Sequence, residues 1–312
     1  MILLAVVLLC VGLTLVILSA DEAIKRLLNL ARFLRLSEFV ISFVLAGVIA
    51  ILPELSIGVL AAAEGSSSLG FGVILGANVA DLTLVIAVVV FSSGKFHLDK
   101  DIMKNIRLSF LAVILPVLLF IDGEISRLDG FVLVVAFIVY VFFLLRTRHD
   151  GASFTGRRQK KQFTIETLIL FVSLVLLFVG GTFITNSSQE ISLALGLPLF
   201  VVGLVIAIGT CLPEMAFAIR SCNKMHCGLG LGNILGNVLA DSLLTIGIVA
   251  IVQPIKPVLI WPPLIAGLFM VFSTLVVFIL SRDGVLDRRD GVVLILIYSL
   301  FIALQSAVAG IT

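Results

Sequence analysis

The sequence predicts an all-α membrane protein with ten transmembrane helices, arranged as two inverted repeats of five helices each. Three observations predict this fold class. Of the 312 residues, 61% are hydrophobic and only 13% are charged, which is more apolar surface than a soluble fold can bury. Apolar stretches of about 20 residues, the length of a membrane-spanning helix, recur along the whole chain. Two short motifs also recur 160 residues apart.

Ten apolar spans are expected, and the short linkers between them leave no room for a soluble domain. They cover residues 1–20, 37–63, 68–92, 105–121, 128–146, 163–184, 189–220, 226–252, 257–280 and 288–309. The first span lacks a basic leader and a small-residue cleavage site, so we expect a retained helix rather than a signal peptide. The longest linker, 148–162, is basic and separates the first five-helix repeat, 1–147, from the second, 163–312.

The distribution of positive charge predicts the orientation in the membrane. Of the 21 Lys and Arg residues, 19 fall in the five loops on one side, and only Arg127 and Lys256 fall on the other. The positive-inside rule then places the rich side in the cytoplasm and both termini outside. The net charge of +2 implies no anionic partner, and no nucleic acid is expected to bind. The expected surroundings are the lipid bilayer, and the oligomeric state is not predicted.

The two recurring motifs keep the same internal spacing in both halves of the chain. Leu-Pro-Glu occurs at 52–54 and at 212–214, and GVILGANVAD at 72–81 matches GNILGNVLAD at 232–241. The Glu and the final Asp are 27 residues apart in each copy. Because each copy has an odd number of spans, the second copy enters the membrane upside down. Inverted repeats are typical of secondary transporters with an ion site near the midplane of the bilayer.

The residues of these motifs have the chemistry of a cation site. Pro53 and Pro213 interrupt apolar helices and free backbone carbonyls, and each is followed by a Glu. Carboxylates beside free carbonyls are hard oxygen ligands for a cation. The Asp of each motif lies inside a later span, where a charge costs at least about 2.5–3.5 kcal/mol. The candidate metal ligands are Glu54, Glu214, Asp81, Asp241, Thr210, Asn78, Asn237, Gly47 and Ala207.

Two alternatives remain open for these polar groups. Protonated carboxyls could serve as interhelical hydrogen-bonding groups, and the Asn and Thr side chains could cap broken helices instead of binding a cation. Neither alternative explains why acidic residues recur at symmetry-related positions.

The repeats resemble the alpha repeats of the cation/Ca2+ exchanger superfamily, and most closely those of its prokaryotic sodium/calcium exchangers. The family pattern is G-T-S-L-P-E followed by G-N-x-x-G-S-N-I-x-[DN], and the second repeat here reads GTCLPE and GNILGNVLAD. The resemblance implies Ca2+ held by the two Glu residues and the Asp positions, with flanking Na+ sites. It also implies a prokaryotic plasma membrane, and alternating access in which the first and sixth helices move against the others.

The chain departs from this pattern where the family uses hydroxyl groups to bind Na+. The first repeat has Ala50, Ile51 and Ala77 at those positions, and the second has Cys211 and Asn237 beside the retained Thr. One Na+ site is therefore expected to be dismantled. Four carboxyls around one divalent ion leave an excess of two negative charges, which makes proton coupling the main alternative.

The expected function is a secondary-active antiporter that exchanges Ca2+, or a similar divalent cation such as Mn2+ or Mg2+, for Na+. The alternatives are H+-coupled divalent cation exchange and a cation channel. The spans contain no nucleophile–base pair and no His-based metal site, so an enzyme is not expected. No cofactor is expected beyond the transported Ca2+ and Na+ or H+. Cys222 and Cys227 are expected to be reduced thiols, because a zinc site would need further ligands.

Overall fold

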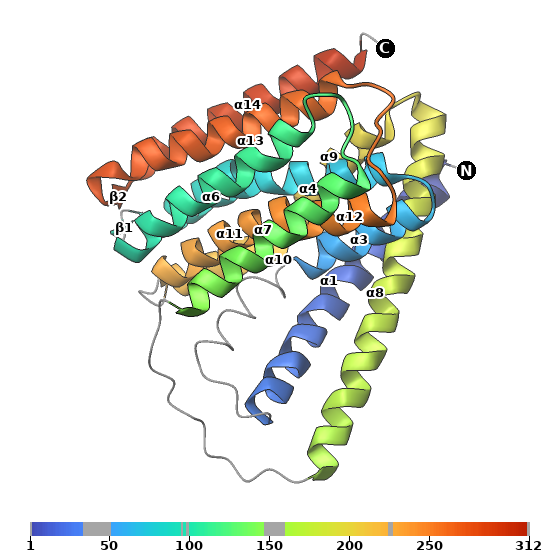
Figure 1. Cartoon of the computed structure of the whole chain (residues 1–312), viewed down its shortest axis with the longest axis horizontal. Helices are drawn as coiled ribbons and strands as arrows, with labels where there is room; N and C mark the ends of the chain where they lie inside the picture. Colours follow the sequence, from blue (N-terminus) through green and yellow to red (C-terminus); the bar gives the residue numbers. More distant parts are fainter. Residues whose placement is uncertain are drawn as a thin grey trace.

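The structure, a computed structural model, describes residues 2–33, 51–94, 96–97, 100–146, 160–223 and 227–310. Nearly all of this part is helical (Figure 1). The elements are α1 (Ile2–Phe33), α3 (Leu52–Ala63), α4 (Ser67–Ala80), η2 (Asp81–Val85), α5 (Ile86–Ser93), β1 (Phe96–His97), α6 (Lys100–Leu119), α7 (Arg127–Arg146), α8 (Lys160–Leu195), α9 (Leu199–Thr210), α10 (Leu212–Asn223), α11 (Cys227–Ala240), η3 (Asp241–Thr245), α12 (Ile246–Val252), α13 (Trp261–Leu280), η4 (Ser281–Asp283), β2 (Val285–Leu286) and α14 (Arg288–Gly310).

Helices of the second half begin and end about 160 residues after helices of the first half. The corresponding pairs are α1 and α8, α3 and α10, α4 and α11, η2 and η3, α5 and α12, α6 and α13, and α7 and α14. The residues equivalent to α9 lie outside the described part of the chain. Equivalent stretches of sequence therefore fold into equivalent helices, even where the residues outside the two motifs differ.

Seven helices in the described part are long and apolar enough to cross a membrane. They are Ile2–Ala23, Ser67–Ser93, Phe163–Leu195, Leu199–Ile219, Gly230–Val252, Trp261–Asp283 and Arg288–Val308, and Leu52–Ala63 and Phe110–Leu119 are shorter apolar helices. Together with the composition, these helices make the chain an all-helical integral membrane protein. Most of the second expected span, 37–63, lies outside the described residues.

The boundary between the sixth and seventh expected spans is wrong. Helix α8 continues to Leu195 instead of ending near residue 184. The polar residues between the two expected spans are compatible with a continuous helix, because Thr185 and Ser188 donate their hydroxyls to backbone carbonyls four residues back. The helix ends where Gly196 adopts a φ of 65°, a conformation that favours glycine. The expectation of reduced thiols is also wrong for Cys222, which is disulfide-bonded.

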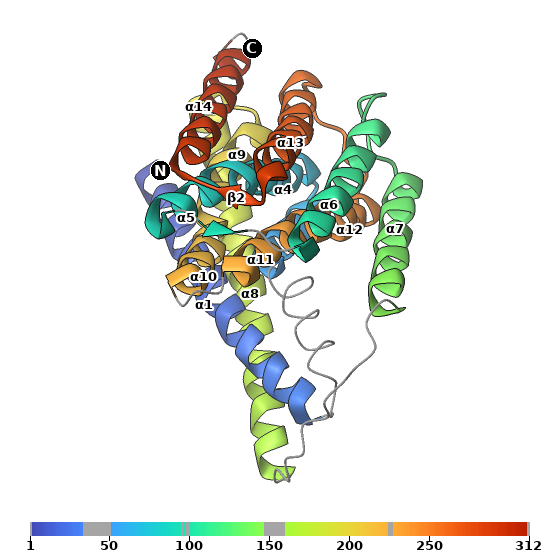
Figure 2. The same cartoon turned by 90° about the vertical axis from the view of Figure 1, so that its left-hand side faces the viewer.

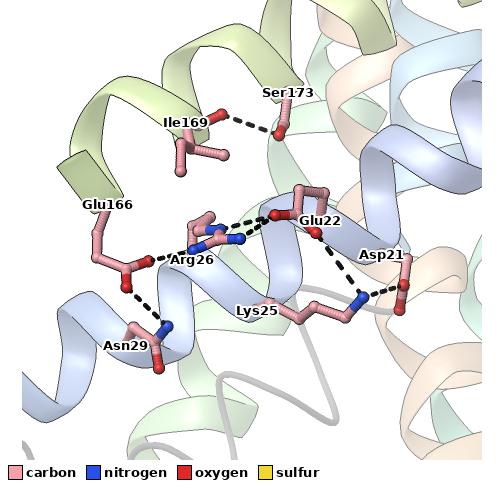
Figure 3. Close-up of polar contacts among 8 residues, drawn as sticks. All are labelled: Asp21, Glu22, Lys25, Arg26, Asn29, Glu166, Ile169 and Ser173. Carbon is pink, nitrogen blue, oxygen red and sulfur yellow. Dashed lines mark hydrogen bonds and ion pairs between the residues drawn. The ribbon is translucent and has the colours of Figure 1, made fainter.

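Helices α1 and α8 run side by side in opposite directions, and one end of the pair projects beyond the other helices (Figures 1 and 2). A Cβ on Gly12 would lie 2.9 Å from the carbonyl oxygen of Gly180, so the two backbones nearly touch there. Nearer the projecting end, Arg26 donates to Glu166 at 3.1 Å, and Asn29 donates to the other oxygen of the same carboxylate at 3.1 Å (Figure 3). Small residues and one polar cluster therefore hold the pair together.

Helices α6 and α13 run between two backbone pairings at opposite ends of the bundle. At one end β1, before α6, pairs with β2, after α13, with Phe96 opposite Leu286. At the other end Ile125, after α6, forms a bridge with Ile255, before α13. The two helices are therefore antiparallel.

The centre of the fold is formed by α4 and α11 with the helical turns that follow them. In the most apolar stretch of Ser67–Ser93, 89% of the residues are buried, and in that of Gly230–Val252, 78% are buried. The corresponding share for Ile2–Ala23 is 22%. The two motifs that end in Asp therefore lie in the interior of the bundle, and α1 lies at its periphery.

Candidate cation-binding site

The two motif glutamates lie in the first turns of their helices. Helix α10 begins directly after Cys211, which separates it from α9, and α3 begins directly after Ile51. A proline at the second position of each helix has no N–H to contribute, which is tolerated in a first turn. Glu54 and Glu214 therefore fall in first turns, where unpaired N–H groups and the helix dipole favour a negative charge.

The two motif aspartates each open a π-helical turn. Asp81 is the first residue of η2, and Asp241 is the first residue of η3. Short π-helical turns interrupt the regular i→i−4 hydrogen bonding and occur frequently at functional sites. Because the same irregularity recurs at equivalent positions, it belongs to the repeated unit and not to one half alone.

All four acidic side chains are buried together in the interior. Glu54, Asp81 and Asp241 have no exposed surface, and Glu214 is 4% exposed. Glu214 interacts electrostatically with each of the other three. The four carboxyls come from both halves of the chain and are close enough for Glu214 to respond to the other three.

Hydrogen bonds across the two halves position this cluster. Asn237 donates from Nδ2 to Oδ2 of Asp81 at 2.9 Å. Asn78 donates from Nδ2 to the hydroxyl of Ser242 at 3.2 Å. Both amides thus use their N–H groups on neighbours from the other half, which leaves their carbonyl oxygens available to a cation.

Seven buried oxygens in this cluster have no hydrogen-bond partner among the residues that the structure describes. Leaving such a group buried and unpaired costs about 1–3 kcal/mol, and more when it is charged. Hard oxygen groups of this kind are the ligands that Ca2+ and other hard cations prefer. The unpaired oxygens are Oε1 and Oε2 of Glu54, Oδ1 of Asn78, Oδ1 of Asp81, Oε2 of Glu214, Oδ1 of Asn237 and Oδ2 of Asp241.

The remaining expected ligands are only partly brought together. Thr210 is buried and donates its hydroxyl to the carbonyl oxygen of Ala207 at 3.1 Å. Gly47 lies outside the described residues, as does Ala50. Within the described part, no three His, Cys, Asp or Glu side chains are grouped tightly enough to enclose one metal ion. A complete coordination shell would therefore need amide, hydroxyl or backbone oxygens in addition to the carboxylates.

Three residues join the cluster that the sequence does not single out. Thr245 donates its hydroxyl to Oδ1 of Asp241 at 2.8 Å. Residues four apart on a helix are neighbours, so the sequence alone could have indicated this contact. Ser242 accepts the hydrogen bond from Asn78. Met270 on α13 lies with its sulfur 3.3 Å from Nδ2 of Asn78, and no local pattern in the sequence points to it.

Comparison with known proteins shows which protein family the chain matches. The sodium/calcium exchanger protein family matches the chain twice, at residues 4–146 and 165–307. The sodium/calcium exchanger MaX1 of Methanosarcina acetivorans is 23% identical over 336 residues, which cover 94% of this chain and 96% of MaX1.

Two groups of solved structures share the fold. The sodium-calcium exchanger NCX_Mj has a TM-score of 0.66 at 23% identity, with 97% of this chain and 99% of that chain covered. The H+/Ca2+ exchanger CAX has a TM-score of 0.76 at 15% identity, with 97% of this chain and 87% of that chain covered. At these identities the matches show a common fold and do not distinguish the coupling ion.

Proposed function

Because the chain belongs to the sodium/calcium exchanger protein family, we propose that it exchanges Ca2+, or a similar divalent cation, for Na+ across the membrane. Members of this family are cation exchangers, which makes the chain a transporter of inorganic cations and not an enzyme. The observation that carries the proposal is the set of buried oxygens on Glu54, Asp81, Glu214 and Asp241 and on the two amides that have no hydrogen-bond partner among the described residues.

The acidic residues have distinct roles in this proposal. Glu54 and Glu214, each in the first turn of a helix, are the central ligands of the divalent cation. Asp81 and Asp241 complete the site or carry exchangeable protons. The oxygens of Asn78, Asn237 and Thr210 and the carbonyls of Gly47 and Ala207 are the proposed additional ligands. Since the same carboxylates would hold either cation, competition between them produces exchange and not leak.

The proposed architecture is ten transmembrane helices in two inverted repeats, 1–147 and 163–312, joined by the cytoplasmic linker 148–162. Two pairs of equivalent helices support the inversion. Helices α6 and α13 run in opposite directions between the two backbone pairings, and α1 and α8 are antiparallel (Figure 1). Opposite directions are expected when a repeat with an odd number of spans is duplicated. The distribution of Lys and Arg supports termini outside the cell.

Alternating access is proposed to come from α1 and α8 moving together against the buried centre. The two helices are tied to each other by the Arg26–Glu166 contact. Only 22% of the apolar stretch of α1 is buried, so its movement would disturb little of the core.

Proton coupling is the second candidate, and one observation favours it. Ile51 and Ala77 are fully buried at positions where the family pattern has hydroxyls, and neither side chain can supply an oxygen to Na+. Four buried carboxyls could exchange protons instead. The comparisons give no support to a channel.

The test is uptake of 45Ca2+ into proteoliposomes, first under an imposed Na+ gradient and then under a pH gradient without Na+. Glu54→Gln and Glu214→Gln should each abolish uptake. Glu64→Gln is the matched control, because Glu64 directly follows α3 and is exposed. Uptake that needs only the pH gradient would establish the second candidate. Uptake that survives in both site variants would contradict the proposed site.

A further inference from the structure

A thioether sulfur lies against one of the two amides of the candidate site. Nδ2 of Asn78 donates to Sδ of Met270 at 3.3 Å and to the hydroxyl of Ser242 at 3.2 Å. The hydroxyl of Ser242 in turn donates to the same sulfur at 3.9 Å. All three side chains are fully buried. Groups from α4, η3 and α13 therefore form one closed set of hydrogen bonds, in which the sulfur is the common acceptor.

The chemistry of the sulfur determines which end of the amide faces it. A thioether can accept a hydrogen bond but has no hydrogen to donate. The Nδ2 end of Asn78 is therefore favoured beside Met270, and the Oδ1 end is directed away from it. A hydroxyl can donate as well as accept, so Ser242 alone would tolerate either orientation of the amide. The orientation of Asn78 therefore depends on Met270.

This orientation matters because the two ends of the amide have opposite effects on a cation. Oδ1 of Asn78 is buried and has no hydrogen-bond partner among the described residues. Asp81 continues α4 in helical conformation three residues later, so the two side chains share one helix face. Carboxylates accept hydrogen bonds from N–H groups, so an amide that could rotate would turn Nδ2 toward the acidic side chains. It would then compete with the cation instead of offering it an oxygen.

The other half of the chain has none of these three groups. The residues 160 positions from Asn78, Ser242 and Met270 are Val238, Leu82 and Phe110. All three counterparts are apolar, so the amide and its acceptor occur together on one side of the site and are both absent from the other. This pairing is expected if the sulfur serves the amide and does not merely fill space in the core.

We propose that Met270 is a positioning residue of the cation site. Its sulfur holds Nδ2 of the Asn78 amide and thereby keeps Oδ1 available as a ligand of the cation. This inference rests on the proposed function, because it assigns a role within the same site. Met270 is not itself a ligand, since its sulfur already accepts hydrogen bonds from Asn78 and Ser242.

The first experiment measures initial rates of 45Ca2+ uptake in proteoliposomes over a range of Ca2+ concentrations. Met270→Leu removes the acceptor at nearly unchanged side-chain volume. If Oδ1 is then available in only a minor fraction of the molecules, the apparent affinity falls by that fraction. The half-saturating Ca2+ concentration should rise roughly tenfold, as when a supporting group is lost at other metal sites. The maximal rate should stay near that of the wild type.

Val277→Ala is the matched control for a loss of packing. Val277 is 2% exposed and lies about two turns later on α13. The variant should lower the melting temperature, because it leaves a cavity in the core, but it should not change the half-saturating Ca2+ concentration. Met270→Ile provides the same comparison as Met270→Leu if the leucine variant elutes abnormally in size-exclusion chromatography.

The second experiment tests whether Met270 acts through the amide. In the Asn78→Ala background, Met270→Leu should cause no further rise in the half-saturating Ca2+ concentration. Thermal denaturation of the wild type, both single variants and the double variant, without divalent cations, provides a readout that needs no transport. The loss of stability in the double variant should be smaller than the sum of the two single losses, because both substitutions remove the same hydrogen bond.

The outcomes separate this inference from the proposed function. The role of Met270 is overturned if Met270→Leu leaves the half-saturating Ca2+ concentration unchanged, or raises it by the same factor in the Asn78→Ala background. Equal effects of Met270→Leu and Val277→Ala also overturn it. If the wild type transports no Ca2+ under either gradient, the proposed function fails. The stability measurements then decide the contact alone, and additive losses would show that the sulfur does not hold the amide.

Discussion

Asn237 donates a hydrogen bond from Nδ2 to Oδ2 of Asp81 at 2.9 Å, from the second half of the chain to the first. The residue equivalent to Asn237 is Ala77, so the other aspartate cannot be held in the same way. Asp241 instead accepts a hydrogen bond from Thr245 of its own turn at 2.8 Å. Two aspartates at equivalent positions thus have different partners, and the site is asymmetric although the two repeats form equivalent helices.

We expect Asn237→Ala to weaken Ca2+ transport, because it removes the donor that orients Asp81. Loss of such a supporting group costs about 10–100-fold in metal affinity at other sites, and the expected result is a rise of that order in the half-saturating Ca2+ concentration. Initial rates of 45Ca2+ uptake over a range of Ca2+ concentrations provide the measurement. Asn29→Ala removes the same type of hydrogen bond, from Asn29 to Glu166, and serves as the control. Equal effects in both variants would count against a role specific to Asp81.

Part of the fold follows directly from the sequence, because the lengths of the apolar stretches and the repetition of the two motifs can be read from the chain alone. Equivalent boundaries in α6 and α13 follow from the shared offset, and the burial of Glu54 and Asp81 is expected because an acidic group facing lipid is costly. The end of α8 does not follow, since the hydroxyls of Thr185 and Ser188 are satisfied within the helix itself. Polar residues there indicate no interruption.

Parts of the site depend on tertiary contacts that no local pattern encodes. The hydrogen bond between Asn78 and Ser242 joins residues 164 positions apart. Met270, whose sulfur contacts Asn78, lies on α13. The π-helical turns that begin at Asp81 and Asp241 likewise have no propensity signal, because they depend on how the surrounding helices pack.

A second prediction concerns the contact between α4 and α9. A Cβ on Gly72 would lie 2.2 Å from the carbonyl oxygen of Phe200, and backbone cannot yield as a flexible side chain can. Gly72→Ala should therefore destabilise the fold by about 1–3 kcal/mol, the usual cost of overpacking. Thermal denaturation monitored by size-exclusion chromatography provides the measurement.

The equivalent glycine of the second half is the control for this prediction. A Cβ on Gly232 would meet nothing within 4 Å among the described residues. Gly232→Ala should be neutral or stabilise by up to about 1 kcal/mol, because Ala is the better helix former. A loss of stability equal to that of Gly72→Ala would show that close packing at α4 is not the cause.

A third prediction concerns the polar cluster that joins α1 to α8 (Figure 3). The Glu166 side chain is 7% exposed and accepts hydrogen bonds from Arg26 and Asn29. Arg26→Gln should destabilise the protein by about 1.5–3 kcal/mol, the range for a hydrogen bond to a charged group. The same melting assay measures the effect.

Lys25→Gln is the matched control for Arg26→Gln. Lys25 pairs with Asp21 at 2.6 Å, but both side chains are more than half exposed, and exposed pairs contribute only about 0–1 kcal/mol. The hydrogen bond that Lys25 donates to Asp21 raises the pKa of Lys25, so Lys25 stays charged at neutral pH and each variant removes a charged donor. If the two variants melted alike, the buried contact would have no special role in holding α1 to α8.

The last prediction addresses the coupling ion. Ala77 is fully buried and stands at the position equivalent to Asn237, whose side chain reaches the acidic cluster. Ala77→Ser returns a hydroxyl oxygen to the position where the family pattern has one. If Na+ is the coupling ion, the added ligand should lower the Na+ concentration that half-maximally drives 45Ca2+ uptake, by roughly threefold to tenfold, since about 1 kcal/mol corresponds to that range. Ala80→Ser, on the same buried helix, should leave it unchanged. If protons alone drive exchange, Ala77→Ser should leave uptake under a pH gradient independent of Na+, because a single hydroxyl cannot replace the proton-carrying carboxyls.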